Sequence, residues 1–434
     1  MSWEWRKIYS YEPHEQHIMN FDTLVIGGGL SGLLCAIRLQ KAGKRTAIVS
    51  SGQNALHFSS GTFSLLHSTP DGTPVDTPLD ALDALEDGHP YRKIGKERME
   101  RLIAEIPGLL QDCGIPVHGQ GTRNSYYLSP MGTWKKAWLA LDDIQLFPDK
   151  SGLQDAEVLL VNFPGYLDFN TAFIEEGLSR SSARVRTETL SVPELDVLRA
   201  NPSEMRSIGI ARIVDREAVR SGIVDAIRGI SKGEDTVVLP AVFGLDDPAI
   251  PGAIRAALGL RTLLVSPMPP SVPGIRTQKL LKKAFLAAGG RMLEGDTVVH
   301  VTLDGQKVSA LYTENLGDTP LTADNYILAS GSFFSRGLHA TPGRIEEPLM
   351  GLDVIAVPGR ENWYDKDFFG RHAYLGFGIG TDKDFHPMKD GMTVHNLWAA
   401  GAVLGGANTL AEGCGAGCAI LTAMAVANHI ISGK

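Results

Sequence analysis

The sequence predicts an α/β protein whose parallel sheet is assembled from two separate stretches of chain. An apolar strand pattern at residues 23–26 runs into a glycine turn and then a helical pattern. A second apolar strand pattern, at residues 325–332, runs into another turn of small residues. The long stretch between them, residues 76–270, has strands and helices of its own, so we expect an inserted cap domain.

The first unit is a strand, a glycine turn, a helix and a strand. The helical pattern carries its leucines largely on one side and ends at Gly43, and residues 45–49 read as the second strand. The turn between the first strand and the helix contains four glycines: Gly27, Gly28, Gly29 and Gly32. This order is typical of the dinucleotide-binding Rossmann unit.

Each glycine of the pattern has a distinct physical task. Gly27 permits the tight turn, Gly29 lets a phosphate approach the backbone, and Gly32 lets the helix pack close to the strand. The N-terminus of the helix offers free N–H groups and the positive end of the helix dipole. The unit therefore predicts a phosphate-bearing ligand at this turn.

The polar loop after the second strand, residues 50–62, is the next candidate for ligand contact. It is rich in hydroxyl groups and lies at the carboxyl end of a parallel strand, where such sheets bind their ligands. The candidate residues in this loop are Ser50, Ser59, Ser60 and Gly61.

The remaining elements follow in order along the chain. Helical spacing appears at residues 79–85 and 96–110, and apolar strand patterns at 155–162, 236–240 and 262–265. After a helix at 277–288, strands are expected at 296–301, 308–312 and 325–332, and a further segment at 393–401 leads to a helix that starts near residue 415. The small-residue turns of this last part contribute the candidates Gly331, Gly401, Gly405 and Gly406.

Composition narrows the class of protein. The chain has 434 residues, a net charge of -8 and 43% hydrophobic residues, which suits a protein with a large core. It shows no basic patch with interleaved aromatic residues, so nucleic acid is not an expected partner. Four cysteines are too few for a disulfide framework and favour a reducing compartment. The apolar run 416–431 contains Asn428 and His429, which favours a buried helix over a membrane span.

Pieces in this order resemble two-domain flavoproteins, in which the first unit and the C-terminal segment pack together beneath a cap. Five separated segments point to one family within this class: residues 54–61, 194–199, 269–276, 328–335 and 349–354. Together they resemble the B subunit of anaerobic glycerol-3-phosphate dehydrogenase. The resemblance divides the chain into an extension (1–19), the flavin-binding unit (20–75), the inserted region (76–270) and the completion of the flavin domain (271–434). Met19 stands directly before the first strand, so we expect either an alternative start there or an N-terminal arm.

The resemblance implies an oxidoreductase complex. In that family, the B subunit pairs with a catalytic FAD subunit, and a membrane-bound iron–sulfur subunit ties the pair to the inner face of the cell membrane. The complex oxidises glycerol 3-phosphate to dihydroxyacetone phosphate and passes electrons to the quinone pool. The implied location is cytoplasmic and peripheral, through a partner. The implied role is a flavin-containing relay, and the alternatives are a stand-alone flavin oxidoreductase and a non-catalytic scaffold.

Two positions bear on which flavin is bound. FAD proteins of this fold usually end the second strand with an acidic residue that holds the ribose, whereas this strand ends in Val49, Ser50 and Ser51. A hydrogen bond to a charged group contributes about 1.5–3 kcal/mol, so its absence favours FMN, with FAD as the alternative. Ala402 follows Gly401 where an aspartate usually contacts the ribityl chain, but both flavins carry that chain.

Other reactive residues favour structural roles. Cys414 and Cys418 open the last helix among glycines and alanines, and two cysteines alone cannot complete a zinc site, so no metal is expected. Cys35 is expected in the core. His372, His386 and His395 have no visible carboxylate partner, and Arg276 and Arg336 could hold a phosphate or form ordinary ion pairs. The sequence therefore assigns no catalytic residue.

Overall fold

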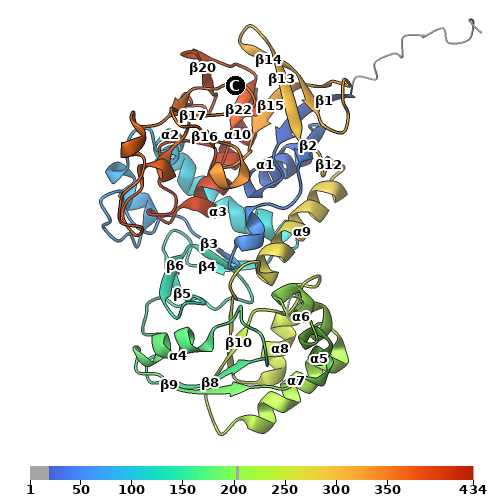
Figure 1. Cartoon of the computed structure of the whole chain (residues 1–434), viewed down its shortest axis with the longest axis vertical. Helices are drawn as coiled ribbons and strands as arrows, with labels where there is room; N and C mark the ends of the chain where they lie inside the picture. Colours follow the sequence, from blue (N-terminus) through green and yellow to red (C-terminus); the bar gives the residue numbers. More distant parts are fainter. Residues whose placement is uncertain (1–18, 202–204, 434) are drawn as a thin grey trace, which may run out of the picture.

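The computed structural model describes residues 19–201 and 205–433. It has two lobes joined by a narrower region, with both ends of the described chain in the same lobe (Figure 1). The expectation of an alternative start at Met19 concerns residues 1–18, which lie outside the described part of the chain.

The larger lobe is built on a seven-stranded sheet in the order β12-β2-β1-β15-β14-β13, with β22 added beside β15. Val25 pairs in parallel register with Ile48 on one side and with Ile327 on the other, so the sheet joins segments about three hundred positions apart in sequence. The strands are β1 (Met19–Ile26), β2 (Thr46–Ser50), β12 (Arg291–Glu294), β13 (Val298–Asp304), β14 (Lys307–Thr313), β15 (Leu321–Leu328) and β22 (Leu397–Ala399). The predicted α/β fold with a discontinuous parallel sheet is confirmed.

Helices cover this sheet because each buries its apolar face against the sheet or against a neighbouring helix. Leu33, Leu34 and Ile37 are fully buried, and the helix that carries them packs against the last helix of the chain. The helices of this lobe are α1 (Leu30–Lys41), α2 (Pro90–Ile94), α3 (Lys96–Asp112), α9 (Val272–Ala287) and α10 (Gly415–Ser432). Among the described residues, α10 alone is long and apolar enough to cross a membrane, but most of it is buried inside the lobe. This supports the predicted buried helix.

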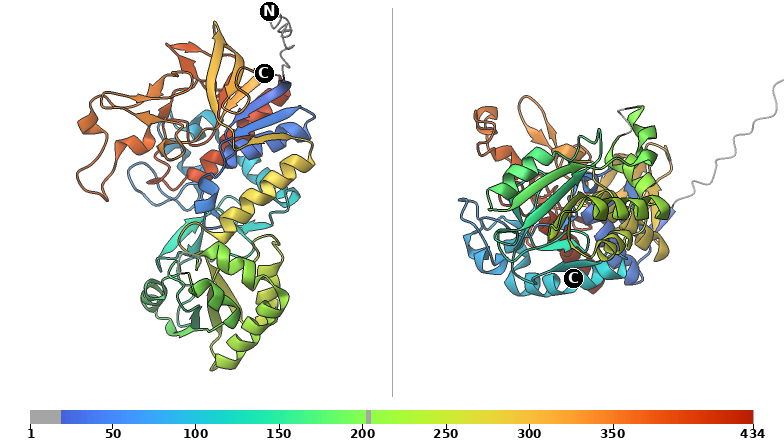
Figure 2. Two further views of the ribbon diagram at one scale, coloured as in Figure 1. Left: turned by 45° about the vertical axis from the view of Figure 1, so that its right-hand side comes forward. Right: turned by 90° about the horizontal axis from the view of Figure 1, so that it is seen from below.

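The second lobe contains its own parallel sheet, in the order β11-β10-β8-β9 (Figures 1 and 2). Val158, Leu159 and Leu160 are fully buried, as expected for a parallel strand covered on both faces. Its elements are β8 (Glu157–Asn162), α4 (Thr171–Ser179), β9 (Arg184–Thr189), α5 (Asp196–Arg199), α6 (Ser207–Val214), α7 (Glu217–Ile230), β10 (Thr236–Pro240), α8 (Ile250–Leu258) and β11 (Arg261–Val265).

Small sheets complete the fold. The strands between the lobes are β3 (Thr62–Phe63), β4 (Val117–Gly119), β5 (Ser125–Leu128), β6 (Trp134–Ala137) and β7 (Leu139–Leu141). Three two-stranded pairs lie between β15 and β22 in the chain: β16 (His339–Ala340) with β17 (Ile345–Glu346), β18 (Val354–Ile355) with β19 (Gly378–Ile379), and β20 (Met388–Lys389) with β21 (Met392–Thr393).

The two hydrophobic cores divide the chain differently from the expected boundary at residue 76. Tyr91, Met99 and Ile106 belong to the core of the larger lobe, because α3 packs against α10. The core of the second lobe draws mainly on residues 144–265. The inserted region of 76–270 therefore contributes its first helices to the larger lobe.

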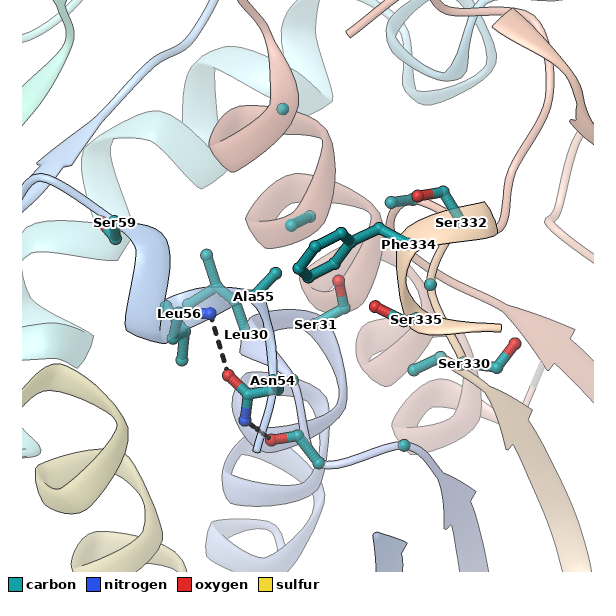
Figure 3. A pocket seen from close by; sticks show the side chains of 18 of the residues that line it. Leu30, Ser31, Asn54, Ala55, Leu56, Ser59, Ser330, Ser332, Phe334 and Ser335 are labelled. Atoms are coloured by element: carbon teal, nitrogen blue, oxygen red, sulfur yellow. Dashed lines mark hydrogen bonds between the residues drawn. The ribbon is translucent and has the colours of Figure 1, made fainter. Parts of the chain in front are cut away.

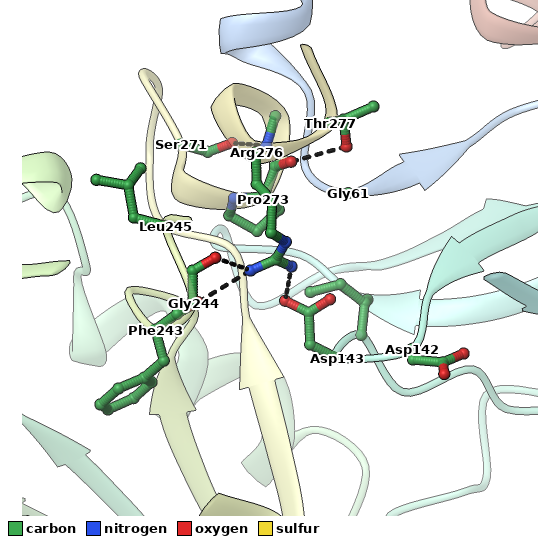
Figure 4. A network of polar contacts seen from close by, with 12 residues as sticks. Gly61, Asp142, Asp143, Phe243, Gly244, Leu245, Ser271, Pro273, Arg276 and Thr277 are labelled. Carbon is green, nitrogen blue, oxygen red and sulfur yellow. Dashed lines mark hydrogen bonds and ion pairs between the residues drawn. The ribbon is translucent and has the colours of Figure 1, made fainter. Parts of the chain in front are cut away.

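A buried ion pair fastens the lobes together (Figure 4). Arg276, near the start of α9, lies 2.6 Å from Asp143 through Nη2, and both side chains are almost fully buried. Its Nη1 donates to the carbonyl oxygens of Phe243 (3.0 Å) and Gly244 (2.7 Å), beyond the end of β10. Both terminal nitrogens of the guanidinium are thus paired, one with the Asp143 carboxylate and the other with two backbone carbonyl oxygens. Of the two roles considered for Arg276, the structure shows the ion pair.

Candidate functional site

A cavity of about 500 Å³ opens at the carboxyl ends of β1, β2 and β15. Figure 3 shows its walls: the start of α1, the loop after β2, the turn after β15 and the first turn of α10. These four walls come from both sequence segments that build the parallel sheet. The cavity therefore lies where ligands bind in open parallel sheets.

The glycines of the first turn serve two purposes: Gly27 and Gly32 allow close backbone packing, and Gly29 leaves space at the cavity. Gly27 has a φ of +115°, which side chains rarely tolerate, and a Cβ there would collide with the Ala329 carbonyl oxygen. A Cβ on Gly32 would collide with the Gly27 carbonyl oxygen, so α1 packs directly against the turn. A Cβ on Gly29 would meet no atom within 4 Å, although Gly29 lines the cavity.

Several polar groups in this cavity fit a phosphorylated ligand. No side chain caps the N-terminus of α1, so its first N–H groups stay available beside the cavity. The Ser330 hydroxyl is buried and has no partner within the protein. The hydroxyl residues along this wall are Ser31, Ser330, Ser332 and Ser335.

The far end of the cavity runs along the loop that follows β2. Asn54 fixes this loop, because its side-chain amide donates to the Gly28 carbonyl oxygen (2.7 Å) and its oxygen accepts from the Leu56 N–H (2.9 Å). Ser50 lies directly beneath the glycine turn, since a Cβ on Gly28 would sit 2.5 Å from the Ser50 Oγ. The loop residues that line the cavity are Ser50, Ser51, Gly52, Gln53 and Asn54.

Apolar side chains also line the cavity. Phe334 lines the cavity and is 66% exposed, and its ring meets Phe58 edge-on with 5.2 Å between ring centroids. Phe63 and Ala416 line the cavity as well. A flat aromatic ring system could lie there, with polar groups at the glycine turn.

About half of the predicted site residues line this cavity. Those that do are Gly27, Gly28, Gly29, Ser50, Ser59 and Gly331. Those that do not are Gly32, Ser60, Gly61, Gly401, Gly405 and Gly406. Of the two candidate segments 59–61 and 401–406, the residues that line the cavity are Ser59 and Ala402.

The glycines that do not line the cavity serve close packing. A Cβ on Gly401 would collide with the Ser31 side chain, and its N–H donates to the Thr422 hydroxyl (2.9 Å). A Cβ on Gly406 would sit 2.5 Å from the Gly88 carbonyl oxygen. Glycine is needed at these positions because two segments of the protein touch there. In the sequence alone, such a glycine cannot be told from one that makes room for a ligand.

The histidine and arginine candidates lie away from the cavity. The ring of His386 is held by a backbone carbonyl oxygen (2.8 Å), and His395 lies 3.0 Å from the Gln306 side-chain oxygen. His372 accepts from a backbone N–H (3.0 Å), and Arg336 ends a short turn with a φ of +62°. None of the four lines the cavity.

Of the turn after β15, sequence reasoning named only Gly331, and it named no residue at the start of α10 as a site residue. The cavity-lining residues that it missed there are Ser330, Ser332, Phe334, Ser335, Gly415, Ala416 and Ala419. The run of hydroxyl and aromatic residues after Gly331 was a usable signal, because it follows the carboxyl end of a buried parallel strand, where such sheets bind their ligands.

The fold and the cavity define a flavin-binding protein. A family model described as an FAD binding domain matches residues 22–418. The B subunit of anaerobic glycerol-3-phosphate dehydrogenase from Yersinia pestis bv. Antiqua (strain Antiqua) is 41% identical over 418 residues, which covers 95% of this chain and 99% of that protein. The corresponding protein of Vibrio cholerae serotype O1 is 35% identical over 426 residues, covering 96% and 97%. The chain belongs to the family of anaerobic glycerol-3-phosphate dehydrogenase B subunits, and it is a flavin-containing subunit of an oxidoreductase complex.

Among solved structures, the 3-ketosteroid delta1-dehydrogenase of Sterolibacterium denitrificans matches 96% of this chain and 100% of its own. Its sequence identity is 11% and its TM-score 0.45.

Proposed function

We propose that this chain carries electrons between the catalytic subunit of the complex and its iron–sulfur subunit. The observation that supports it most directly is the cavity at the glycine turn, whose walls suit a flavin, in a chain of this family. A bound flavin supplies electron transfer in one- or two-electron steps. Among the described residues, no cysteine cluster suits an iron–sulfur centre, so the onward carrier is a partner.

The chain's own residues hold and shield the cofactor in this proposal. The free N–H groups at the start of α1 and the Ser330 hydroxyl bind phosphate oxygens. Phe334 and Phe58 cover the apolar end and limit the access of water. No histidine or carboxylate among the described residues lines the cavity, which suits electron transfer better than acid–base chemistry on a substrate.

We infer that the flavin is FAD, the alternative to the FMN favoured by the strand end at Ser50. The family model is described as an FAD binding domain. The cavity also continues past the glycine turn along residues 50–54, where the AMP half of FAD would lie. Mass spectrometry of flavin released by denaturation tests this choice. FAD supports the inference, and FMN restores the first expectation.

The proposal places the chain in a three-subunit assembly. A catalytic FAD subunit delivers electrons, and a membrane-bound iron–sulfur subunit receives them and passes them to the quinone pool. The family name supports a complex of several subunits. On this proposal the chain is cytoplasmic and peripheral, held at the inner face of the membrane through the iron–sulfur subunit.

Anaerobic reduction by glycerol 3-phosphate separates the proposal from its alternatives. A relay is reduced only when the catalytic subunit is present. A stand-alone flavin oxidoreductase is reduced by its own substrate without that subunit, and a scaffold purifies without flavin. Absorbance at the flavin bands, recorded with the chain alone and with the catalytic subunit, distinguishes the three.

A further inference from the structure

A buried cluster of reactive side chains lies beside the flavin cavity. The Sγ atoms of Cys414 and Cys418 are 3.6 Å apart, and Cys414 Sγ lies 3.8 Å from Glu412 Oε2. His89 Nε2 lies 3.1 Å from the same carboxylate oxygen. All four residues are at most 4% exposed. From the sequence, the two cysteines were expected to serve packing. Packing alone does not explain why a buried carboxylate and a buried histidine lie beside them.

Hydrogen-bond direction excludes His89 as a metal ligand. The imidazole Nδ1 accepts from the Tyr91 N–H (3.0 Å), so Nδ1 carries no proton. In the neutral ring the proton is then on Nε2, where it is donated to Glu412. A metal on Nε2 needs a lone pair there, and metal-bound histidines donate through their other nitrogen. The remaining cluster is two thiols and one carboxylate.

The thiols form a directed chain toward the carboxylate. Cys418 donates to Cys414, and Cys414 donates to Glu412. The hydrogen bond with Cys418, together with burial, raises the pKa of Cys414 above its ordinary value. Burial and this hydrogen bond therefore favour the thiol form of Cys414 over its thiolate. Glu412 is positioned to accept a proton when a thiol loses one.

The backbone at this point permits a bond between the sulfurs. Cys418 lies one helical turn after Cys414, which precedes α10 and has non-helical φ and ψ of -121° and 7°. A disulfide needs about 2.05 Å between sulfurs, so they must approach by about 1.5 Å. A residue at the end of a helix can move this far more easily than one in its interior.

The cluster separates two cavities. Gly415, Ala416 and Ala419, on the same turn of α10, line the flavin cavity. His89 and Glu412 line a second cavity of about 360 Å³. The pair therefore adjoins residues of the flavin cavity through α10 and residues of the second cavity through Glu412.

We propose that Cys414 and Cys418 are a redox-active pair that alternates between two thiols and a disulfide in exchange with the flavin of this chain. Oxidation breaks two S–H bonds and forms one S–S bond. The two electrons are accepted by the oxidised flavin, and the two protons leave through Glu412 toward the second cavity. The inference rests on flavin binding by this chain and does not depend on the direction of the relay.

Counting thiols tests the pair directly. The full-length, flavin-loaded protein is oxidised with ferricyanide or reduced with dithionite, then denatured in iodoacetamide and weighed. The chain has four cysteines, so the reduced protein gains four alkyl groups. The oxidised protein is expected to gain two fewer, with a peptide linking residues 414 and 418. Anaerobic dithionite titration is expected to consume four electrons per chain, against two in the Cys414→Ser/Cys418→Ser variant.

Cys113→Ser is the matched control, because Cys113 is buried far along the chain from the pair. Oxidation should still remove two alkylatable thiols from that variant. Four alkyl groups on the oxidised wild-type protein would overturn the proposal. So would one equivalent of zinc that co-purifies with the chain and is lost in Cys414→Ser. Flavin-free protein gives the same thiol count with ferricyanide, so a failure here is distinct from a failure of flavin binding.

Discussion

Gly29 and Gly32 are three residues apart, yet added side chains would have opposite consequences. At Gly32 the backbone of the preceding turn fills the space a Cβ would need. At Gly29 the same space is open and belongs to the cavity. The first glycine pattern therefore combines one position that serves the fold with one that serves the ligand.

Gly29→Val is expected to lower flavin affinity at least tenfold, equivalent to about 1.4 kcal/mol, while the protein stays folded. The branched side chain enters the space of the phosphate, and its Cβ has no protein atom within 4 Å. Flavin content after gel filtration, alongside a circular dichroism spectrum, measures both effects. Gly32→Val is the control and should fail to fold. Full flavin content in folded Gly29→Val would refute the placement of the phosphate.

His67 should make the protein sensitive to mild acid. Burial, with Lys136 and Lys135 nearby, lowers the pKa of His67 to about 4, and its Nε2 has no hydrogen-bond partner. The unfolded chain then binds a proton more tightly than the folded chain, so stability is lost as pH falls from about 6.5 toward 4. We expect His67→Gln to flatten this decline in urea unfolding midpoints. Parallel declines in the two proteins would contradict the assignment.

At the scale of elements, the buried ion pair between Arg276 at the start of α9 and Asp143 makes a contribution to the free energy of unfolding that can be measured. Asp143→Ala leaves the buried Arg276 guanidinium without its carboxylate, which typically costs about 3–5 kcal/mol. Urea unfolding should show this loss. Asp246→Ala, which removes the exposed partner of Lys279 on the same helix, should have almost no effect. Equal losses of unfolding free energy in the two variants would show that the buried ion pair stabilises the protein no more than the exposed one.

The elements that the sequence could predict are those whose signals are local. The strand pattern at residues 23–26 and the glycines after it correspond to β1 and the start of α1, and the pattern at 325–332 overlaps β15. The domain boundary expected at residue 76 could not be corrected from the sequence. The apolar pattern of α3 predicts that one face is buried, but not which of the two cores buries it. Gly401 and its neighbour Ala402 show the same limit at the site. Only the folded backbone decides which of them faces the cavity.

At the scale of the whole molecule, an apolar surface suggests where a partner subunit docks. Phe368 and Phe369 are 82% and 91% exposed, and Ile355, Val357 and Tyr364 are exposed in the same segment. Large exposed apolar side chains mark interaction sites, and this segment borders the second cavity.

Phe368→Ser/Phe369→Ser should weaken at least tenfold the capture of a partner subunit, without loss of flavin, since aromatic side chains dominate interface energies. Pull-down of tagged chain with the co-expressed catalytic and iron–sulfur subunits of the proposed assembly measures it. Leu167→Ser, which removes an equally exposed side chain (83%) from the second lobe, is the control. Undiminished capture by the double variant would place the interface elsewhere.

Quinone reduction by a complex that contains Gly29→Val tests the central claim most directly. If this chain relays electrons, glycerol 3-phosphate should still reduce the flavin held by the catalytic subunit, with the wild-type rate. Electron delivery to quinone should fall at least tenfold, because the cofactor held at the glycine turn is missing. Wild-type quinone reduction by a complex in which this chain is folded, bound and free of flavin would contradict the relay.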